Sequence, residues 1–210
     1  EAMSAFAKEV HEGYGSLDIL VNVAGVALFS QIEDMQHSHW EKVIKVNLWG
    51  VVHGLECFVP EMIRAGQGGH IVSVSSTAGL IGLPWHVVYA GTKHALVGMS
   101  EVLRYDLRKH NIGVSVICPG AVNTGLVQTA EINTDNKTVV DKTRKYFQKI
   151  AISPDKVADL IVKAIRNRKF IVITSFDIKL FYFLKRFCFP LYHLIMIQIS
   201  RSMDKILKKK

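Results

Sequence analysis

The sequence has few cysteines, no recognisable metal-binding pattern and no low-complexity linker. Its three cysteines, Cys57, Cys118 and Cys188, are widely spaced and odd in number, which argues against a disulfide framework and favours a reducing compartment. The nine histidines include no H-E-x-x-H pattern, so we expect no metal site. No signal peptide is visible either, and we expect a cytoplasmic protein.

What the sequence does contain is typical of a single α/β domain. Hydrophobic residues make up 49% and charged residues 21% of the 210 residues, which is enough apolar material for a sizeable core. Strand-like apolar runs alternate with helix-like stretches, a pattern that predicts a parallel sheet covered by helices. The expected helices are residues 2–12, 37–64, 86–110 and 154–166, and the expected strands are residues 18–23, 69–76, 113–118 and 170–174. Residues 123–153 are expected to form a long irregular loop that covers the substrate.

Tyr89 and Lys93 form the most informative pair in the chain. Their spacing of four residues within the helix expected at residues 86–110 places the phenol and the ammonium on one face. An ammonium beside a phenol favours phenolate, so a tyrosine with an unperturbed pKa of ~10 can approach the working pH and act as a general acid or base. Tyr105 and Lys109 repeat the spacing, and we interpret that second pair as part of a solvated helix face.

Ser76 ends a run of residues, 69–76, that has the pattern of a buried strand. Ligands of open α/β sheets bind at the carboxyl ends of strands. Ser76 is therefore expected to lie in a substrate site together with Tyr89. A serine at a strand end also often caps a turn, and this structural alternative stays open.

These residues are part of a set of sequence segments that together resemble the classical short-chain dehydrogenase/reductase family over about residues 1–174. Residues 17–25 resemble the fourth strand of the family and its Asn-Asn-Ala-Gly turn. Residues 46–50 resemble the helix that carries the active-site asparagine of the family, and residues 113–124 resemble its sixth strand and the Pro-Gly loop beside the nicotinamide. The fold that this implies is a Rossmann-like, doubly wound parallel sheet.

The resemblance implies an NAD(P)-dependent oxidoreductase that interconverts a secondary alcohol and a ketone. Tyr89 would exchange a proton with the substrate oxygen, and Ser76 would donate a hydrogen bond to the same oxygen. Lys93 would lower the pKa of Tyr89 and donate to the nicotinamide ribose, while Asn47 would hold a water that links Lys93 to solvent. The implied catalytic residues are Asn47, Ser76, Tyr89 and Lys93, and the implied cofactor contacts are Asn22, Ala24, Gly25, Tyr89, Lys93, Pro119, Gly120, Val122 and Thr124. For Asn47, local hydrogen bonding within the helix is the structural alternative.

Two departures from the family pattern affect what can be inferred. Val23 replaces the second asparagine of the turn, and no G-x-x-x-G-x-G or G-x-G-x-x-G run occurs in the sequence. That glycine-rich turn holds a pyrophosphate at a helix N-terminus, and a residue after the second strand selects NAD or NADP. We therefore expect a piece of a longer enzyme without its first three strands, with an apolar edge at residues 18–22. Both NAD and NADP stay open as cofactors.

The C-terminal residues, 175–210, are expected to form a helical extension beyond a domain at residues 1–174. Residues 141–210 hold 17 Lys and Arg against 5 Asp and Glu, and residues 187–199 are almost continuously apolar. Thirteen residues are too few to span a bilayer, but they are enough to lie in its interface, where basic flanks are attracted to anionic lipid. Peripheral membrane contact is one interpretation, and packing on the core, on the substrate pocket or on a second copy of the chain is the other.

The substrate is expected to be apolar or lipid-like. Six apolar residues lie between Ser76 and Tyr89, namely Leu80, Ile81, Leu83, Pro84, Trp85 and Val87, although core packing accounts for such residues equally well. The competing class of function is a non-catalytic, membrane-associated or binding module that retains the fold. Nucleic acid is not an expected partner, because the basic residues come without a recognised binding motif.

Overall fold

The computed structural model describes residues 1–134 and 137–208, which are built around a parallel sheet of four strands. The strands are adjacent in the order β1-β3-β4-β6, and all three pairs are parallel. Their bounds are β1 (Ile19–Asn22), β3 (Gly69–Val74), β4 (Ile112–Cys118) and β6 (Ile171–Ile173). The predicted Rossmann-like α/β fold is confirmed.

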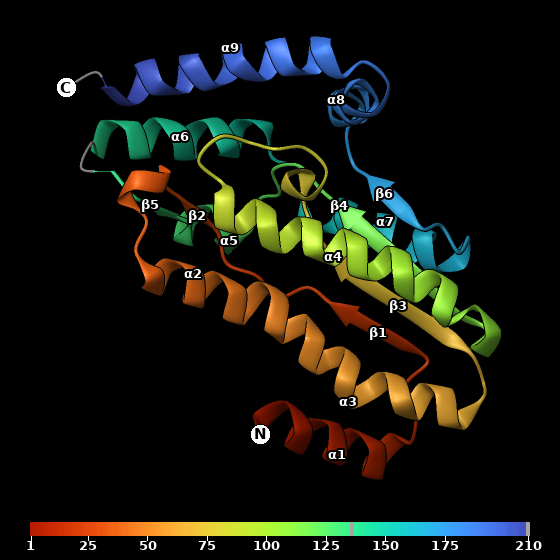
Figure 1. The fold of residues 1–210 in the computed structure, drawn as a ribbon. Coiled ribbons are helices and arrows are strands. Elements are labelled where there is room, and N and C mark those ends of the chain that lie inside the picture. Colours follow the sequence, from red (N-terminus) through yellow and green to blue (C-terminus); the bar gives the residue numbers. More distant parts are fainter. Residues whose placement is uncertain (135–136, 209–210) are drawn as a thin grey trace.

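Helices cover both faces of this sheet (Figure 1). Their bounds are α1 (Ala2–Tyr14), α2 (His37–Ile44), α3 (Gly50–Ala65), α4 (Val87–Asp106) and α7 (Pro154–Arg166). Successive side chains of β3 point to opposite layers, because Ile71 packs in a cluster with α1 and α3 whereas Val72 packs against α7. Both side chains are fully buried, as expected for a parallel strand that is covered on both faces.

The carboxyl ends of β1, β3 and β4 lie at one side of the sheet, and the smaller elements lie beyond that side (Figure 1). These elements are β2 (Leu28–Phe29), β5 (Glu131–Ile132), α5 (Gly125–Thr129) and α6 (Lys137–Ile150). β2 and β5 form a separate parallel pair in which Phe29 lies opposite Ile132. Ligands of such sheets bind at this side, so the expected site lies between the strand ends and these elements.

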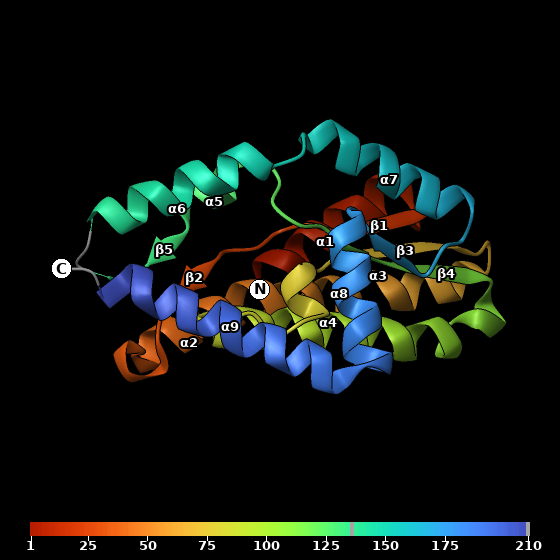
Figure 2. The ribbon, with the colours of Figure 1, turned by 90° about the horizontal axis from the view of Figure 1, so that it is seen from above.

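The C-terminal residues form two helices, α8 (Phe176–Phe187) and α9 (Phe189–Lys208). Figure 2 shows α9 leaving the end of α8 and extending toward the side on which α2 and α6 lie. Both helices contribute to a hydrophobic cluster with β4, through Ile178 of α8 and Tyr192 of α9. Among the described residues, no helix is both long and apolar enough to cross a membrane.

Two expectations about local structure are wrong. α1 passes through Gly13 and ends at Tyr14, with Gly15 at φ 73° after it; a glycine inside a helix costs only about 1 kcal/mol, which packing of α1 offsets. Residues 123–153 are not an irregular loop, since they contain α5, β5 and α6. The half-buried residues of α6 include Val140, Thr143 and Phe147, whose spacing follows the helical period and buries one face.

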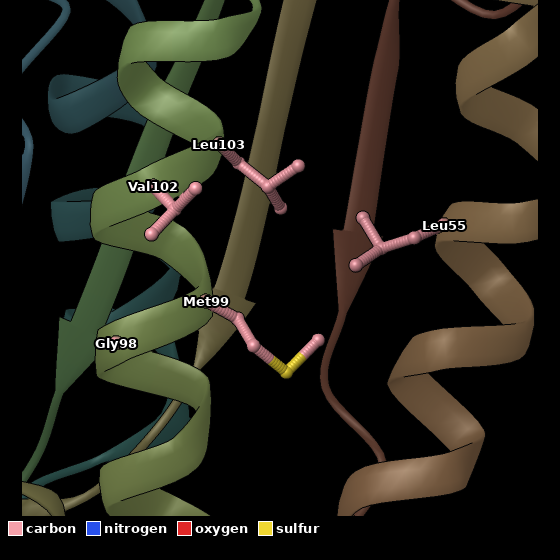
Figure 3. Close-up of a pocket in the computed structure, with 5 residues that line it drawn as sticks. All are labelled: Leu55, Gly98, Met99, Val102 and Leu103. Carbon is pink, nitrogen blue, oxygen red and sulfur yellow. The ribbon is translucent and has the colours of Figure 1, made fainter.

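An open apolar hollow lies between α3 and α4 (Figure 3). It is lined by Leu55, Gly98, Met99, Val102 and Leu103. No side chain of this lining can donate or accept a proton. The hollow is therefore not a site for the acid–base chemistry expected of Tyr89.

Candidate active site

Ser76, Tyr89 and Lys93 converge at the carboxyl end of β3. Ser76 follows the strand and begins a short 3₁₀ turn, η3 (Thr77–Gly79), in which its Oγ accepts a hydrogen bond from the amide of Ala78 at 3.2 Å. Tyr89 lies in the first turn of α4, and its phenol forms a hydrogen bond with the Ser76 side chain. The Nζ atom of Lys93 lies 5.7 Å from the centroid of the Tyr89 ring. The structure thus brings together the three residues that the sequence singles out.

The turn after β3 is held against α4 by contacts that the sequence analysis did not identify. The Ser75 hydroxyl donates to the main-chain oxygen of Lys93 at 2.8 Å. A Cβ atom on Gly79 would lie 2.6 Å from the same oxygen, so only glycine allows this approach. Thr77 also donates, through its amide and its hydroxyl, to the Pro119 carbonyl. The turn is therefore fixed to both α4 and the loop after β4.

Lys93 is almost completely buried, with 3% of its surface exposed. Its Nζ atom donates to the main-chain oxygen of Val74 at 3.0 Å. Burial lowers the pKa of Lys93 to about 8, and the neighbouring Cys118 opposes this shift. A Cβ atom on Gly25 would lie 3.4 Å from both the Lys93 Nζ and the Asn47 Oδ1. The turn after β1 therefore passes directly beside the ammonium.

The pKa of Tyr89 differs from the expectation. Burial raises the pKa of its phenol, and the hydrogen bond from Ser76 opposes the rise without cancelling it. The side chain is 8% exposed, so the phenolate would lose most of its hydration. The Lys93 ammonium donates to the Val74 carbonyl, and its expected lowering of the Tyr89 pKa stays a prediction. The phenol stays protonated at neutral pH.

Asn47 lies in a π-helical turn, η2 (Lys45–Trp49), that interrupts the single helix expected at residues 37–64. Its side chain is fully buried. The Oδ1 atom accepts from the amide of Val26 at 2.8 Å, and Nδ2 donates to the Val26 carbonyl at 2.9 Å and to Thr92 Oγ1 at 3.3 Å. Asn47 therefore ties the loop after β1 to α4. Its expected role in holding a water stays a prediction.

The residues expected to contact a cofactor lie after two strands of the sheet. Asn22 ends β1 and is followed by Ala24 and Gly25, whereas Pro119, Gly120, Val122 and Thr124 follow β4. The Asn22 Nδ2 atom is buried and has no hydrogen-bond partner among the described residues. The Gly120 amide donates to Thr174 Oγ1 at 3.2 Å, Val122 pairs with Ile152, and Thr124 is exposed. Both groups therefore lie at the side of the sheet where Ser76 lies.

A row of aromatic rings begins at Tyr89, and sequence reasoning missed its other members. The ring of His86 lies 6.2 Å from that of Tyr89, the ring of Phe29 lies 4.4 Å from His86, and the ring of Phe147 lies 5.8 Å from Phe29. Burial lowers the pKa of His86, and the hydrogen bond that its Nδ1 donates to the Pro84 carbonyl opposes this shift without cancelling it. The imidazole is therefore neutral at pH 7. Phe29 comes from β2, His86 and Tyr89 from the start of α4, and Phe147 from α6. Sequence spacing connects His86 to Tyr89, but it does not connect either of them to the two phenylalanines.

The C-terminal helices cover the segment between Ser76 and α4. Leu80 and Ile81 are buried in a cluster with residues of α8 and α9. Tyr192 accepts a hydrogen bond from the Gly82 amide at 3.1 Å, and the Lys185 ammonium donates to the Leu80 carbonyl at 2.7 Å. The apolar character of Leu80 and Ile81 is therefore explained by packing against the tail rather than by contact with a substrate.

Comparisons with known proteins agree with this geometry. A family model described as short chain dehydrogenase matches residues 1–135. The chain is 36% identical over 175 residues to the probable oxidoreductase EphD of Mycobacterium tuberculosis, an alignment that covers 80% of this chain but 30% of that protein. The chain thus spans under a third of the length of that relative.

Solved structures are also similar. A short chain dehydrogenase/reductase of Burkholderia phymatum in complex with NAD is 28% identical, with a TM-score of 0.81 over 90% of this chain and 72% of that one. A gluconate 5-dehydrogenase of Burkholderia cenocepacia in complex with NADP and tartrate is 27% identical, with a TM-score of 0.57 over 66% of this chain and 51% of that one. Since the family model matches more than half of the residues, the chain belongs to the short-chain dehydrogenase family.

Proposed function

We propose that the chain forms the catalytic part of an NAD(P)-dependent oxidoreductase that interconverts a secondary alcohol and a ketone. The convergence of Ser76, Tyr89 and Lys93 at the carboxyl end of β3 is the observation that carries this proposal. Tyr89 supplies the proton to the substrate oxygen in ketone reduction, and Ser76 donates a hydrogen bond to that oxygen as charge develops on it. The raised pKa of Tyr89 favours the protonated phenol, which is the form that reduction requires.

The residues after β1 and β4 fit a nicotinamide cofactor, and related structures contain NAD or NADP. When bound, the cofactor supplies or accepts the hydride. The fit rests on two features of the turn after β1. The buried Asn22 Nδ2 lacks a partner among the described residues, and Gly25 lies directly beside the Lys93 ammonium, where a Cβ atom would already be in van der Waals contact with it. Lys93 has further N–H groups beyond the one that it donates to Val74, and we assign these to the cofactor ribose.

The proposal is tested by replacing Tyr89 with phenylalanine in the natural full-length protein. Only the hydroxyl is lost, so we expect kcat for ketone reduction to fall by roughly 10²–10⁴-fold while nicotinamide binding persists. Tyr105→Phe is the matched control, since Tyr105 lies on the same helix and its side chain is exposed. A near-normal kcat in Tyr89→Phe would assign the acid role elsewhere and would favour the alternative of a non-catalytic module.

A second candidate function, peripheral attachment to anionic membranes, is supported by the exposed face of α8. Four apolar side chains recur along it at helical spacing, with exposed fractions of 79, 47, 54 and 74% for Phe176, Leu180, Phe183 and Phe187. Lys179 and Arg186 are exposed on the same helix. An apolar stripe beside cations is the pattern of helices that lie in a membrane interface.

Three further proposals concern organisation. The division into a domain at residues 1–174 and an extension at residues 175–210 is retained as a proposal, with the extension sharing a hydrophobic cluster with the domain. The apolar hollow between α3 and α4 is the surface that we assign to a homo-oligomer contact (Figure 3). The three unpaired cysteines are in keeping with the cytoplasmic location that we propose.

A further inference from the structure

We propose that Phe29, His86 and Phe147 form one wall of the substrate site and select substrates that carry an aromatic ring beside the reacting carbonyl or alcohol carbon. This inference rests on the proposed function, because it places the ring of the substrate next to Tyr89. It goes beyond that function by naming the class of substrate and the side chains that distinguish it.

The row of aromatic rings is continuous with Tyr89, the proposed proton donor. The ring centroids are separated by 6.2 Å from Tyr89 to His86, by 4.4 Å from His86 to Phe29 and by 5.8 Å from Phe29 to Phe147. Aromatic pairs at 4.5–7 Å attract one another through edge-to-face and offset contacts. The Phe29 and His86 rings meet almost edge to face, with an interplanar angle of 86°. A further ring next to Tyr89 would extend the same kind of contact.

The row formed by Phe29, His86 and Phe147 is uncharged, and part of its ring surface is exposed. His86 is neutral because burial lowers its pKa, and the other two members carry no ionisable group. Phe29 and Phe147 are only half-buried, whereas Phe58, a core residue of α3, is 3% exposed. Rings that served only as core would be covered in the same way as Phe58. The uncovered ring surface of Phe29 and Phe147 is available to a ligand.

Phe29 and His86 are held in place by main-chain hydrogen bonds, whereas Phe147 is carried by a separate helix, α6. The amide of Asn133 donates to the Phe29 carbonyl at 2.8 Å, and the amide of Ser30 donates to the Trp85 carbonyl at 2.9 Å. These bonds hold Phe29 beside the residue that precedes His86. Phe147 belongs to α6, which lies beyond the strand ends (Figure 1). Phe147 is therefore the member whose substitution disturbs the fold least.

The test uses two ketones of nearly the same shape, acetophenone and cyclohexyl methyl ketone, with the natural full-length protein and either NADPH or NADH. For Phe147→Ala we expect kcat/KM for acetophenone to fall about tenfold through KM, because ring contacts of this kind contribute that much discrimination. The value for the saturated ketone should stay within about twofold. Phe147→Leu, which keeps the apolar volume and removes the ring, should resemble the alanine variant.

Gln148→Ala is the matched control, since Gln148 follows Phe147 on α6 and its side chain is exposed; it should leave kcat/KM for both ketones unchanged. An equal loss for both ketones in Phe147→Leu, or no loss for either, would overturn the inference. Saturation-transfer NMR of the two ketones reports binding without turnover. Binding that prefers acetophenone and depends on Phe147 in a protein with no turnover would overturn the proposed function alone, and turnover without this preference would overturn this inference alone.

Discussion

Lys93 is the residue whose burial has the clearest energetic consequence. Its pKa is lowered from 10.5 to about 8, a difference of about 2.5 units that corresponds to roughly 3 kcal/mol of unfavourable burial of the charged form. Below pH 8 the lysine is charged in both the folded and the unfolded states, so the folded protein carries this cost in full. Between pH 8 and 10.5 the unfolded chain retains the proton that the folded chain has lost, and the free energy of unfolding therefore rises with pH.

We predict that Lys93→Met removes this rise. Between pH 7 and 9 the free energy of unfolding of the wild type should increase by about 1 kcal/mol relative to the variant. The raised pKa values of Cys118 and Tyr89 act in the opposite direction, and that of Cys118 does so already as pH approaches 9, the ordinary pKa of its thiol. Both proteins carry these two residues, so the difference between the wild type and the variant isolates the effect of Lys93. Urea denaturation at pH 7, 8 and 9 measures the effect. Lys109→Met is the control, since Lys109 is exposed in the short turn that follows α4. Parallel pH profiles for wild type and Lys93→Met would show that the lysine is not desolvated.

Helix α3 illustrates how one residue sets the distance between two elements. Gly54 faces the end of β1, and a Cβ atom on it would lie 2.6 Å from the Oδ1 atom of Asn22. The helix can approach the strand this closely only without a side chain at that position. Asn22 lies in the turn that we assign to the cofactor, so the fit between α3 and β1 also positions the site.

We predict opposite effects for two glycines of this helix. Gly54→Ala should lower the free energy of unfolding by roughly 1–3 kcal/mol, because the methyl group forces Asn22 to move in a packed interface. Gly50→Ala should be neutral or stabilising by up to about 1 kcal/mol, since a Cβ atom there meets nothing within 4 Å and alanine is the better helix former. Thermal or urea denaturation of the two variants decides between these expectations. Equal effects at both positions would contradict the close contact at Asn22.

At the scale of the whole molecule, the described surface carries exposed apolar residues on β1 and on α8 in addition to the hollow between α3 and α4. β1 is the end strand of the four-stranded sheet, and Ile19 and Val21 are 45% and 40% exposed, in agreement with the apolar edge expected at residues 18–22. The exposed apolar residues of α8 lie within residues 141–210, where Lys and Arg outnumber Asp and Glu. The net charge of +8 favours approach of anionic surfaces, and the location of the positive charge directs that approach to the C-terminal helices.

We predict that the natural full-length protein floats with anionic vesicles through the α8 stripe. Substituting both Phe183 and Phe187 with glutamine should remove most of this binding, since each buried phenylalanine contributes roughly 2 kcal/mol. Salt should weaken the binding without abolishing it, because each cation near the surface adds only about 1 kcal/mol. The experiment compares flotation on neutral and anionic vesicles.

Val162→Gln is the control for this experiment, since Val162 is an apolar residue of α7 that is 45% exposed. Surface substitutions are preferred to deletion of the tail, because deletion would uncover Leu80 and Ile81. Recovery of the wild type and the double variant in the same unbound fraction would contradict membrane attachment. The exposed stripe would then be left as a contact surface for another protein chain.

The sequence by itself determined the elements and the centre of the candidate site. The four strands of the main sheet and helices α1, α4 and α7 follow from apolar periodicity, which reports burial directly because side chains alternate in strands and repeat every 3.6 residues in helices. The strand pair β2 and β5 and the helices α5 and α6 were not predicted. Ser76, Tyr89 and Lys93 could be grouped because one lies at a strand end and the other two share a helix face. These are local properties, and the tertiary structure had only to bring one strand end beside one helix.

Only the tertiary structure decided the features that depend on distant neighbours. Whether the pKa of Tyr89 is raised or lowered depends on how completely the folded chain excludes water from the phenol. The partners of Asn47 depend on a π-helical turn that no pattern in the sequence marks. The row from Tyr89 to Phe147 joins residues from three elements, because contact between distant segments is set by packing rather than by spacing along the chain. The C-terminal helices likewise cover Leu80 because burial of their apolar faces requires a partner, and the sequence does not specify which surface provides it.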